Sequence, residues 1–431
     1  MTRQIDKSMQ HHSFRLLVLF LSLIYVGWGS AQHTHLRAGD WPQILGPSRN
    51  GIADDETLAP SWPKSGPKVV WSRPVGSGLA GVAILGNKGV LFHRLEDREV
   101  VEGFDVATGE STWTQSYASS FLPQVGSEDG PLCVPTIAGD LVVTFGAQGV
   151  LSCFDLKTGR QLWQRKTHTE FEALEGYFGA GSCPLVVGDR VFVNVGGHKT
   201  DAGIVAIDLR DGETLWHVTN ERASYAAPID ATITGQQTII CLARTKCLGL
   251  DPKDGAVRFE IPFGRLGPTV NAALPIIDDD RLFLTASYGI GALSARLSAD
   301  GAKELWRRAD SLASQYTTPI LHDDVYYAID GRQDGPPADL VCLDPNTGDR
   351  LWTEEGFGYA TLIRAGDQMI AVKTDGELVL MKTSQVGFEP LSQSRLTSST
   401  MRPLPALSNG RLYVRDTKTL FCVEVGQRSS E

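Results

Sequence analysis

Residues 149–163 read GVLSCFDLKTGRQLW, and this segment predicts two antiparallel strands joined by a tight turn. An apolar run leads up to Asp155, and its side chains point alternately to the two faces of the strand. Asp155 can accept hydrogen bonds from backbone amides just after it, and Gly159 supplies the positive φ that closes the turn. Trp163 follows four residues after the glycine. The segment therefore reads as a hairpin that ends in a large aromatic ring.

The same hairpin pattern recurs along the chain. The aromatic positions are Trp71, Trp113, Trp163, Trp216, Phe259, Trp306 and Trp352. The matching turn aspartates are Asp105, Asp155, Asp208, Asp251 and Asp344, and the turn glycines are Gly109, Gly159, Gly212, Gly255 and Gly348. Successive aromatic positions are between 42 residues (Trp71 to Trp113) and 53 residues (Trp163 to Trp216) apart. A repeat of this length with four short strands in each copy is typical of β-propeller blades.

The C-terminal part of the chain contains two incomplete repeats. One begins near Tyr359 and lacks the turn aspartate and the tryptophan, and the last begins at Pro405 and stops before its outer strand. The strand around Trp71 comes before the first complete repeat and is free to complete the last one. We therefore predict an all-β fold, an eight-bladed β-propeller of four-stranded antiparallel blades whose ring is closed by the N-terminal strand near Trp71.

The N-terminal end has the pattern of an export signal. Basic residues precede an apolar run from Leu16 to Trp28, and the small residues Gly29, Ser30 and Ala31 follow it. This pattern predicts a signal peptide over residues 1–31 and a periplasmic or secreted protein. A transmembrane anchor is the alternative, but the run is short beside the ~20 residues that a membrane-spanning helix needs. No cysteine follows the run, so the usual bacterial lipid-attachment site is missing.

The rest of the chain divides into three predicted segments. Residues 32–66 are polar and proline-rich and predict an extended strap outside the sheets, pinned on the body by Trp41 and Trp62. Residues 67–426 form the propeller, and residues 427–431 form a polar tail. His33 and His35 could bind a metal ion, but a flexible polar chain end is the favoured interpretation.

Charge and cysteine content bear on partners and on redox chemistry. The formal net charge is −10 and Lys and Arg are not clustered, so we expect no nucleic-acid partner. The seven cysteines suit small apolar positions in the sheets, although export also permits disulfides. An odd count leaves at least one thiol unpaired or in an intermolecular link, and the pairing stays open.

A family resemblance rests on the spacing small-x-Asp-x3-Gly-x3-Trp. This spacing occurs at Cys153 to Trp163, at Ala206 to Trp216 and at Cys342 to Trp352. It resembles the tryptophan-docking repeat of the pyrroloquinoline-quinone-like (PQQ-like) β-propeller family, and the resemblance covers most of the chain after the signal. It implies that each repeat tryptophan packs between neighbouring blades. In character the chain is most similar to the non-catalytic outer-membrane protein assembly factor propellers.

The same family includes quinone-dependent dehydrogenases, so the resemblance also implies an alternative. Those enzymes carry a tryptophan under the quinone, usually a disulfide between adjacent cysteines, and a Ca²⁺ site with an acidic base. Here Trp28 belongs to the signal, Trp41 and Trp62 to the strap, and the other six tryptophans to the repeat. The chain also has no adjacent cysteine pair and no C-x-x-C-H motif for haem. We therefore expect no catalytic, cofactor-binding or metal-binding residue. The alternative is that the protein is a PQQ- and Ca²⁺-dependent alcohol or sugar dehydrogenase, or a relic of one that still binds the quinone.

The longest connecting segments indicate where a partner would bind. Segments 114–130, 164–180, 196–202 and 331–338 belong to the face opposite the Asp…Gly turns, and long loops on a rigid scaffold are common binding sites. Their candidate contact residues are Tyr117, Phe121, Phe171, Tyr177, Phe178, His198 and Arg332. We expect a monomeric scaffold that binds a polypeptide or another envelope component at this face.

Overall fold

The computed structural model describes residues 37–267 and 269–427. The predicted signal peptide, His33, His35 and residues 428–431 lie outside the described residues. Within the described part, strands dominate, and one short helix, α1 (Thr167–Glu170), follows the second blade. None of the helices in this part is long and apolar enough to cross a membrane.

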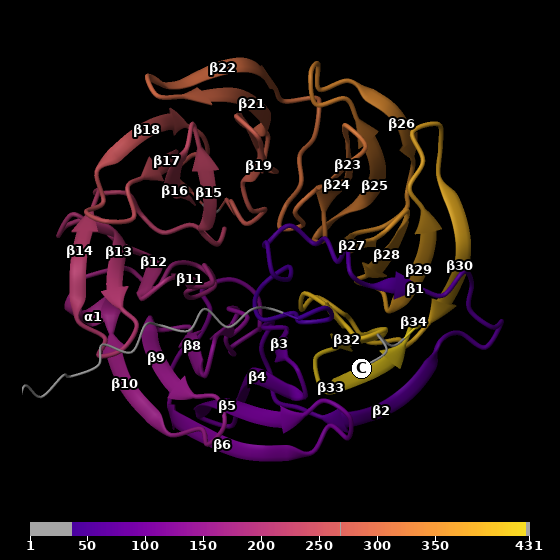
Figure 1. Cartoon of the computed structure of the whole chain (residues 1–431), viewed down its shortest axis with the longest axis horizontal. Helices are drawn as coiled ribbons and strands as arrows, with labels where there is room; N and C mark the ends of the chain where they lie inside the picture. The colour runs from indigo at the N-terminus through magenta and orange to yellow at the C-terminus, as the bar shows by residue number, and fades with distance from the viewer. Residues whose placement is uncertain (1–36, 268, 428–431) are drawn as a thin grey trace, which may run out of the picture. The chain divides into compact units, whose positions relative to one another are not determined.

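Eight four-stranded antiparallel sheets follow one another around a ring (Figure 1). The strands of each blade are given from the innermost outward. Blade 1 consists of β3 (Val82–Leu85), β4 (Lys88–Leu95), β5 (Arg98–Asp105) and β6 (Ser111–Ala118), and blade 2 of β7 (Thr136–Ala138), β8 (Leu141–Phe145), β9 (Val150–Asp155) and β10 (Gln161–Lys166). Blade 3 consists of β11 (Leu185–Val187), β12 (Arg190–Gly197), β13 (Ala202–Asp208) and β14 (Thr214–Val218), and blade 4 of β15 (Ile229–Ile233), β16 (Gln236–Leu242), β17 (Lys246–Leu250) and β18 (Val257–Pro262). Blade 5 consists of β19 (Ile276–Asp278), β20 (Arg281–Ala286), β21 (Gly291–Ser298) and β22 (Gly301–Arg308), and blade 6 of β23 (Ile320–His322), β24 (Val325–Arg332), β25 (Gly335–Leu343) and β26 (Arg350–Glu354). Blade 7 consists of β27 (Ala360–Ala365), β28 (Gln368–Lys373), β29 (Glu377–Lys382) and β30 (Glu389–Arg395), and blade 8 of β31 (Ala406–Ser408), β32 (Arg411–Arg415), β33 (Thr419–Glu424) and β2 (Lys68–Pro74). The predicted eight-bladed propeller is confirmed.

The ring closes through the N-terminal strand, as predicted. In blade 8 the strand order is β2-β33-β32-β31, so the outermost strand comes from the start of the propeller and the other three from its end. Trp71 of β2 lies opposite Cys422 of β33 in the antiparallel register. This pairing leaves blade 8 with the same four strands as its neighbours and joins the two ends of the ring.

Burial along the strands explains why these sequences form blades. The second and third strands of a blade are buried on both faces, as in β9, where Leu151, Ser152, Cys153 and Phe154 are all buried. Each blade therefore packs its two faces against its two neighbours. The outer strands alternate instead: in β6 every other side chain is exposed, because one face of that strand meets solvent.

The repeat tryptophans lie between blades. A register shift between Gln161 and Trp163 in β10 turns the indole toward blade 3, where its Nε1 donates a hydrogen bond to the Leu209 carbonyl at 2.9 Å. A Cβ atom added at Gly212 of that blade would lie 2.8 Å from the Trp163 ring, so the turn must be glycine for the indole to fit. The same bond to the next blade joins Trp71 to Val106 (3.1 Å), Trp113 to Leu156 (2.9 Å), Trp216 to Pro252 (3.2 Å), Trp306 to Pro345 (3.0 Å) and Trp352 to Ser384 (2.9 Å).

The turn aspartates organise the acceptor side of this contact. Asp155 Oδ1 accepts hydrogen bonds from the backbone amides of Lys157 and Thr158, at 3.1 and 2.7 Å. Blade 4 is the exception among the aromatic positions, because Phe259 has no N–H to donate. The turn that follows it in blade 5, between β21 and β22, also lacks the Asp…Gly pattern. The donor and its acceptor turn are thus missing together.

The N-terminal segment differs from the predicted non-sheet strap. Its β1 (Thr57–Leu58) pairs with β34 (Gly426–Gln427), so Gln427, which we expected in the polar tail, belongs to a small sheet. Trp41 is fully buried and forms a bridge with Ile84 of β3. The non-sheet prediction was wrong for β1 and β34, because pairing with a distant strand leaves no local sequence signal, whereas Trp41 and Trp62 are buried, as expected for indoles that pin the segment.

Residues 43–53 run through the centre of the ring, where the indigo segment of Figure 1 passes among the innermost strands. The Arg49 guanidinium donates to the carbonyls of Cys183, Pro184 and Pro228, just ahead of the innermost strands of blades 3 and 4. On the other side of the centre, Ala53 N donates to the carbonyl of Arg364 in blade 7 at 2.8 Å. Burial lowers the pKa of Arg49 to about 10, so the guanidinium stays charged at neutral pH. The segment therefore fills the channel between opposite blades.

Candidate functional site

The links between blades form one face of the propeller, which we call the loop face. It comprises residues 75–81, 119–135, 167–184, 219–228, 263–275, 309–319, 355–359 and 396–405, together with the turns between second and third strands. The antiparallel order of every sheet places these segments at the same edge and the Asp…Gly turns at the opposite one. The docked indoles hold the blades that carry the links, so the face rests on a rigid scaffold.

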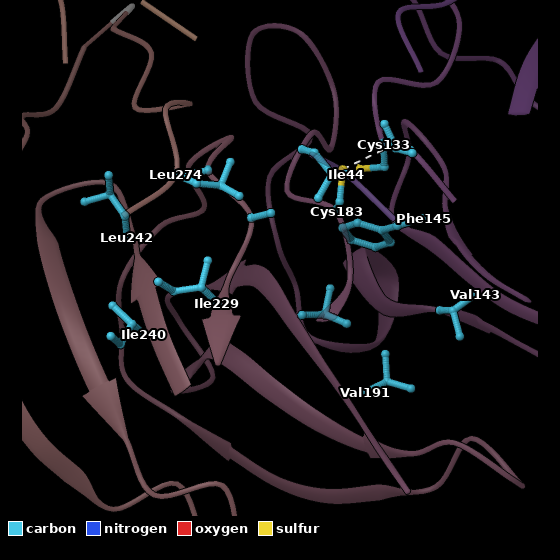
Figure 2. Close-up of a cluster of buried hydrophobic side chains, with 14 of the residues drawn as sticks. Ile44, Cys133, Val143, Phe145, Cys183, Val191, Ile229, Ile240, Leu242 and Leu274 are labelled. Carbon is cyan, nitrogen blue, oxygen red and sulfur yellow. Dashed lines mark hydrogen bonds between the residues drawn. The ribbon is translucent and has the colours of Figure 1, made fainter. Parts of the chain in front are cut away.

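A cavity of about 270 Å³, the central pocket, opens on the loop face over the channel. Its walls come from seven of the eight links between blades, and they are mostly apolar. They include Leu79, Val125, Leu132, Phe178, Tyr225, Val270, Tyr316 and Leu404. Ile44 of the channel segment also lines it, and Figure 2 shows this side chain beside Cys133 and Cys183. Because the N-terminal segment occupies the channel, the pocket has a floor.

A second cavity, the side pocket, has a volume of about 370 Å³ and lies between the links of blades 2, 3 and 4. It shares Gly181 and Tyr225 with the central pocket, so the two cavities adjoin. Its polar lining includes Arg222, Arg244, Glu175, His168, Asn194 and Ser224. The chemistry therefore changes from apolar to charged on passing from one pocket to the other.

Large apolar side chains stand exposed around the two pockets. Their exposed fractions are 75% for Leu122, 48% for Val125, 57% for Leu174 and 60% for Leu266. All four belong to loop-face links, and Val125, Leu174 and Leu266 also line a pocket. A cluster of exposed apolar side chains on a rigid surface is typical of a protein-binding site.

Only two of the seven predicted contact residues border the pockets: Tyr177 lines the side pocket and Phe178 the central pocket. Phe121 is fully buried, so its prediction as a partner-contact residue was wrong. Its ring packs beneath the link of residues 167–184, where a Cβ atom added at Gly179 would lie 2.9 Å from the ring. Phe171 packs against His217, with ring centroids 5.9 Å apart.

The remaining predicted contact residues lie elsewhere on the same face. Tyr117 is half-buried and donates a hydrogen bond to Glu99 at 2.6 Å. His198 is half-buried in the turn after β12. Arg332 lies in blade 6, where it pairs with Asp334 at 2.6 Å and covers the ring of Tyr288. The structure therefore does not gather the seven residues into one site.

Sequence reasoning missed Tyr225, Arg222 and Arg244, which form the wall between and beside the pockets. They come from the short link of residues 219–228 and from the turn after β16, whereas the search for binding residues favoured long segments. Two arginines, one in the link of residues 219–228 and one in the turn between β16 and β17, are the one signal that the sequence offers.

Two ionisable groups beneath the loop face are held by the scaffold itself. His93 Nδ1 accepts a hydrogen bond from the Gly76 amide at 2.8 Å, and burial together with Arg415 and Arg73 lowers its pKa to about 3. The Glu102 carboxylate lies 3.6 Å from Nε2, but burial and the two cations dominate. Glu99 accepts hydrogen bonds from Tyr117 and from the Ala147 amide, and burial raises its pKa. Both side chains are therefore engaged in hydrogen bonds within the scaffold and do not point freely into either pocket.

The cysteines and the family's cofactor can be tested against the residues present. All seven cysteines are buried free thiols, which answers the question of pairing. Among residues 37–267 and 269–427, no three His, Cys, Asp or Glu side chains gather as they must to hold a metal ion. None of the described tryptophans lines either pocket. These residues do not fit a quinone stacked on an indole beside Ca²⁺.

Comparison with known proteins gives one family and several relatives. The family described as "Outer membrane protein assembly factor BamB" matches residues 52–176 and 97–354, which together make up more than half of the chain. The chain is 24% identical over 362 residues to the outer membrane protein assembly factor BamB of Yersinia pestis, covering 79% of this chain and 85% of that protein.

Two solved structures share the fold. BamB from Moraxella catarrhalis superposes with a TM-score of 0.59 at 18% identity, over 83% of this chain and 99% of that one. A europium-containing methanol dehydrogenase superposes with a TM-score of 0.63 at 12% identity, over 88% of this chain and 89% of that one. At such identities the likeness describes the fold alone, and it includes both an assembly factor and an enzyme.

Proposed function

Because this chain belongs to the family of the outer membrane protein assembly factor BamB, we propose that it is an exported, non-catalytic scaffold that binds a polypeptide of the cell envelope at its loop face. The proposal places the protein in the periplasm, as a monomeric propeller that needs neither quinone nor metal ion for binding. The assembly of outer-membrane proteins is the process in which we expect its partner to act.

The observation that carries the proposal is the group of exposed apolar side chains around the two pockets, Leu122, Val125, Leu174 and Leu266. Exposing such side chains to water is unfavourable, and covering them with a partner contributes about 25 cal/mol for each Å² of apolar surface. The pockets beside them give that partner a shaped surface, which a flat patch would lack.

The alternative function is a PQQ-dependent dehydrogenase or a relic that binds the quinone. The likeness to a methanol dehydrogenase is one of fold. No described tryptophan lines either pocket, and no three His, Cys, Asp or Glu side chains of the described residues gather as a metal site requires. The scaffold is therefore the better-supported function.

The proposal can be tested by partner capture from envelope extract of the source organism. In the loop-face variant, Leu122 and Leu174 are both replaced by Asp, which places charge in the apolar surface at exposed positions. In the matched control, Val386→Asp changes a side chain that is 88% exposed on the opposite face, in the turn between β29 and β30. We expect wild type and control to retain an outer-membrane assembly protein and the loop-face variant to lose it. Equal retention by all three, or loss in the control alone, would contradict the proposal.

A further inference from the structure

The side pocket contains a buried cation whose contacts carry no opposite charge. Arg244 is 7% exposed; its guanidinium donates to the Thr269 carbonyl and lies over the Tyr225 ring, 5.6 Å from the centroid. No carboxylate oxygen of the described residues comes within 4.0 Å of it. A buried charge without a counter-ion is costly, so this position favours an anionic group in the cavity beside it.

The lining of the side pocket is cationic although the protein as a whole is acidic. Arg222 is exposed at the rim of the same cavity, and its carbonyl accepts the Arg244 amide at 3.0 Å, so the two arginines come from neighbouring segments. Glu175 is the one carboxylate in the lining, and it already accepts a hydrogen bond from Gln148 at 2.9 Å. A carboxylate is the ligand group that matches two guanidinium groups in an otherwise apolar and amide-rich wall.

Two buried polar atoms in the same lining have no partner. Asn194 is buried; its Nδ2 donates to the Ser224 hydroxyl at 3.4 Å and to the Leu242 carbonyl at 3.5 Å, and its Oδ1 has no partner. His168 Nδ1 is also unpaired, and burial lowers the pKa of this imidazole to about 4, so it is neutral at pH 7. An acceptor such as Asn194 Oδ1 requires an N–H or O–H donor. Peptide amides supply such donors beside a carboxylate, whereas a fatty acid has none.

The adjoining central pocket suits an apolar side chain. Its volume of about 270 Å³ and its apolar walls leave room for a residue of the size of Leu or Phe, and the Ile44 floor stops the ligand from passing down the channel. Tyr225 separates the two cavities, so one short segment of chain can reach both.

We propose that the paired pockets bind an extended polypeptide segment that places an apolar side chain in the central pocket and a carboxylate against Arg244 and Arg222 in the side pocket. This inference rests on the proposed function and specifies the chemistry of the partner segment. The carboxylate comes from an Asp or Glu side chain or from a chain end, since both present the same group to the arginines.

Binding can be measured by fluorescence anisotropy with three N-terminally labelled peptides. The first is Gly-Ser-Gly-Ser-Leu-Leu with a free C-terminal carboxylate, the second is its C-terminal amide, and the third is the amide of Gly-Ser-Gly-Asp-Leu-Leu. We expect the first or the third to bind at least tenfold more tightly than the neutral amide. If the first is the tighter of the two, the natural carboxylate is a chain end, and if the third is tighter, it is a side chain. Equal binding of all three peptides, or no binding, would overturn the inference.

Variants assign the binding to the pockets. Arg222→Gln changes an exposed side chain and should weaken binding of the carboxylate peptide about threefold to tenfold without changing the fold. Arg244→Gln should weaken it at least tenfold and should remove the preference over the amide; its thermal midpoint is checked first because the residue is buried. Arg296→Gln, an exposed arginine of blade 5 outside both pockets, is the matched control and should leave binding unchanged. Equal weakening in all three variants would contradict the site.

The outcome for this site is separable from that for the proposed function. If wild-type protein captures its envelope partner through Leu122 and Leu174 but binds none of the peptides, the pocket chemistry is wrong and the loop-face scaffold stands. If oleate or pyrroloquinoline quinone binds more tightly than every peptide and the Arg222→Gln change weakens that binding, the pockets hold a small molecule and the inference fails. Peptide binding without partner capture by the loop face would leave the pocket chemistry intact and contradict the scaffold.

Discussion

Replacing Trp163 with alanine tests how the ring is held together. The indole is buried between blades 2 and 3 and donates to the Leu209 carbonyl at 2.9 Å. An indole buries on the order of 200 Å², and a Trp→Ala change in a packed site costs about 3–5 kcal/mol. The lost hydrogen bond belongs to that total and accounts for about 1 kcal/mol of it. We therefore expect the free energy of unfolding to fall by about 4 kcal/mol.

The assay is thermal and urea-induced unfolding followed by tryptophan fluorescence and circular dichroism. For a ring of about 360 residues that unfolds as one unit, 4 kcal/mol corresponds to a midpoint lowered by about 5 °C. Trp163→Phe should cost about 1–2 kcal/mol, since a smaller aromatic ring remains and the hydrogen-bond donor is lost. Leu215→Ala, on the exposed side of an outer strand, is the control and should change stability by less than about 0.5 kcal/mol. A Trp163→Ala protein as stable as wild type would refute the docking role of the repeat tryptophans.

Three further predictions concern buried groups. The pKa of His93 is about 3 in the native protein and near 6.5 ordinarily, so between these values the unfolded chain binds a proton that the native protein excludes. Urea unfolding should therefore show a free energy of unfolding that falls as the pH drops from 6.5 towards 3. The His93→Gln change should flatten that pH dependence. Arg49→Met removes the donor to the carbonyls of Cys183 and Pro228 and one of the two donors to the Pro184 carbonyl. It should lower the free energy of unfolding by about 3 kcal/mol, while Lys64→Met at an exposed position should not. Equal effects would contradict the role of the channel segment. Ellman's reagent should react with all seven thiols only after unfolding, and a total lower by two would reveal a disulfide.

The blades were predictable because each one is encoded by a short, contiguous sequence repeat. The spacing of Asp155, Gly159 and Trp163 defines one hairpin, and its recurrence fixes the number and order of the blades. Each feature acts within one blade or on the next one, so a pattern in sequence corresponds to a contact in space. Even the missing donor at Phe259 coincides with a degenerate turn in the following blade.

The channel segment was not predictable in the same way. Ile44 and Arg49 lie among prolines, glycines and polar residues, which favour a surface strap when only local sequence is considered. They are buried because the closed ring leaves a space that this segment fills, and that space exists only after blades far apart in sequence have assembled. Burial here follows from tertiary structure alone.

The candidate site was predictable only as a face. Antiparallel blades require the inter-blade links to share one side, and Tyr177 and Phe178 lie there as expected. Which side chains meet depends on how each link folds over the channel: Phe121 turns inward, and Tyr225 and Arg244 come together from short segments that loop length did not single out.

The most direct test of the account is site-specific photo-crosslinking in intact cells. A photoreactive amino acid is placed in turn at Leu122, Leu174 and Leu266 on the loop face and at Val386 on the opposite face. We predict crosslinks from the three loop-face positions to an outer-membrane protein assembly component and none from Val386. Crosslinks from Val386 alone, or purification of the protein with bound pyrroloquinoline quinone and dye-linked alcohol oxidation, would contradict a non-catalytic scaffold that acts through its loop face.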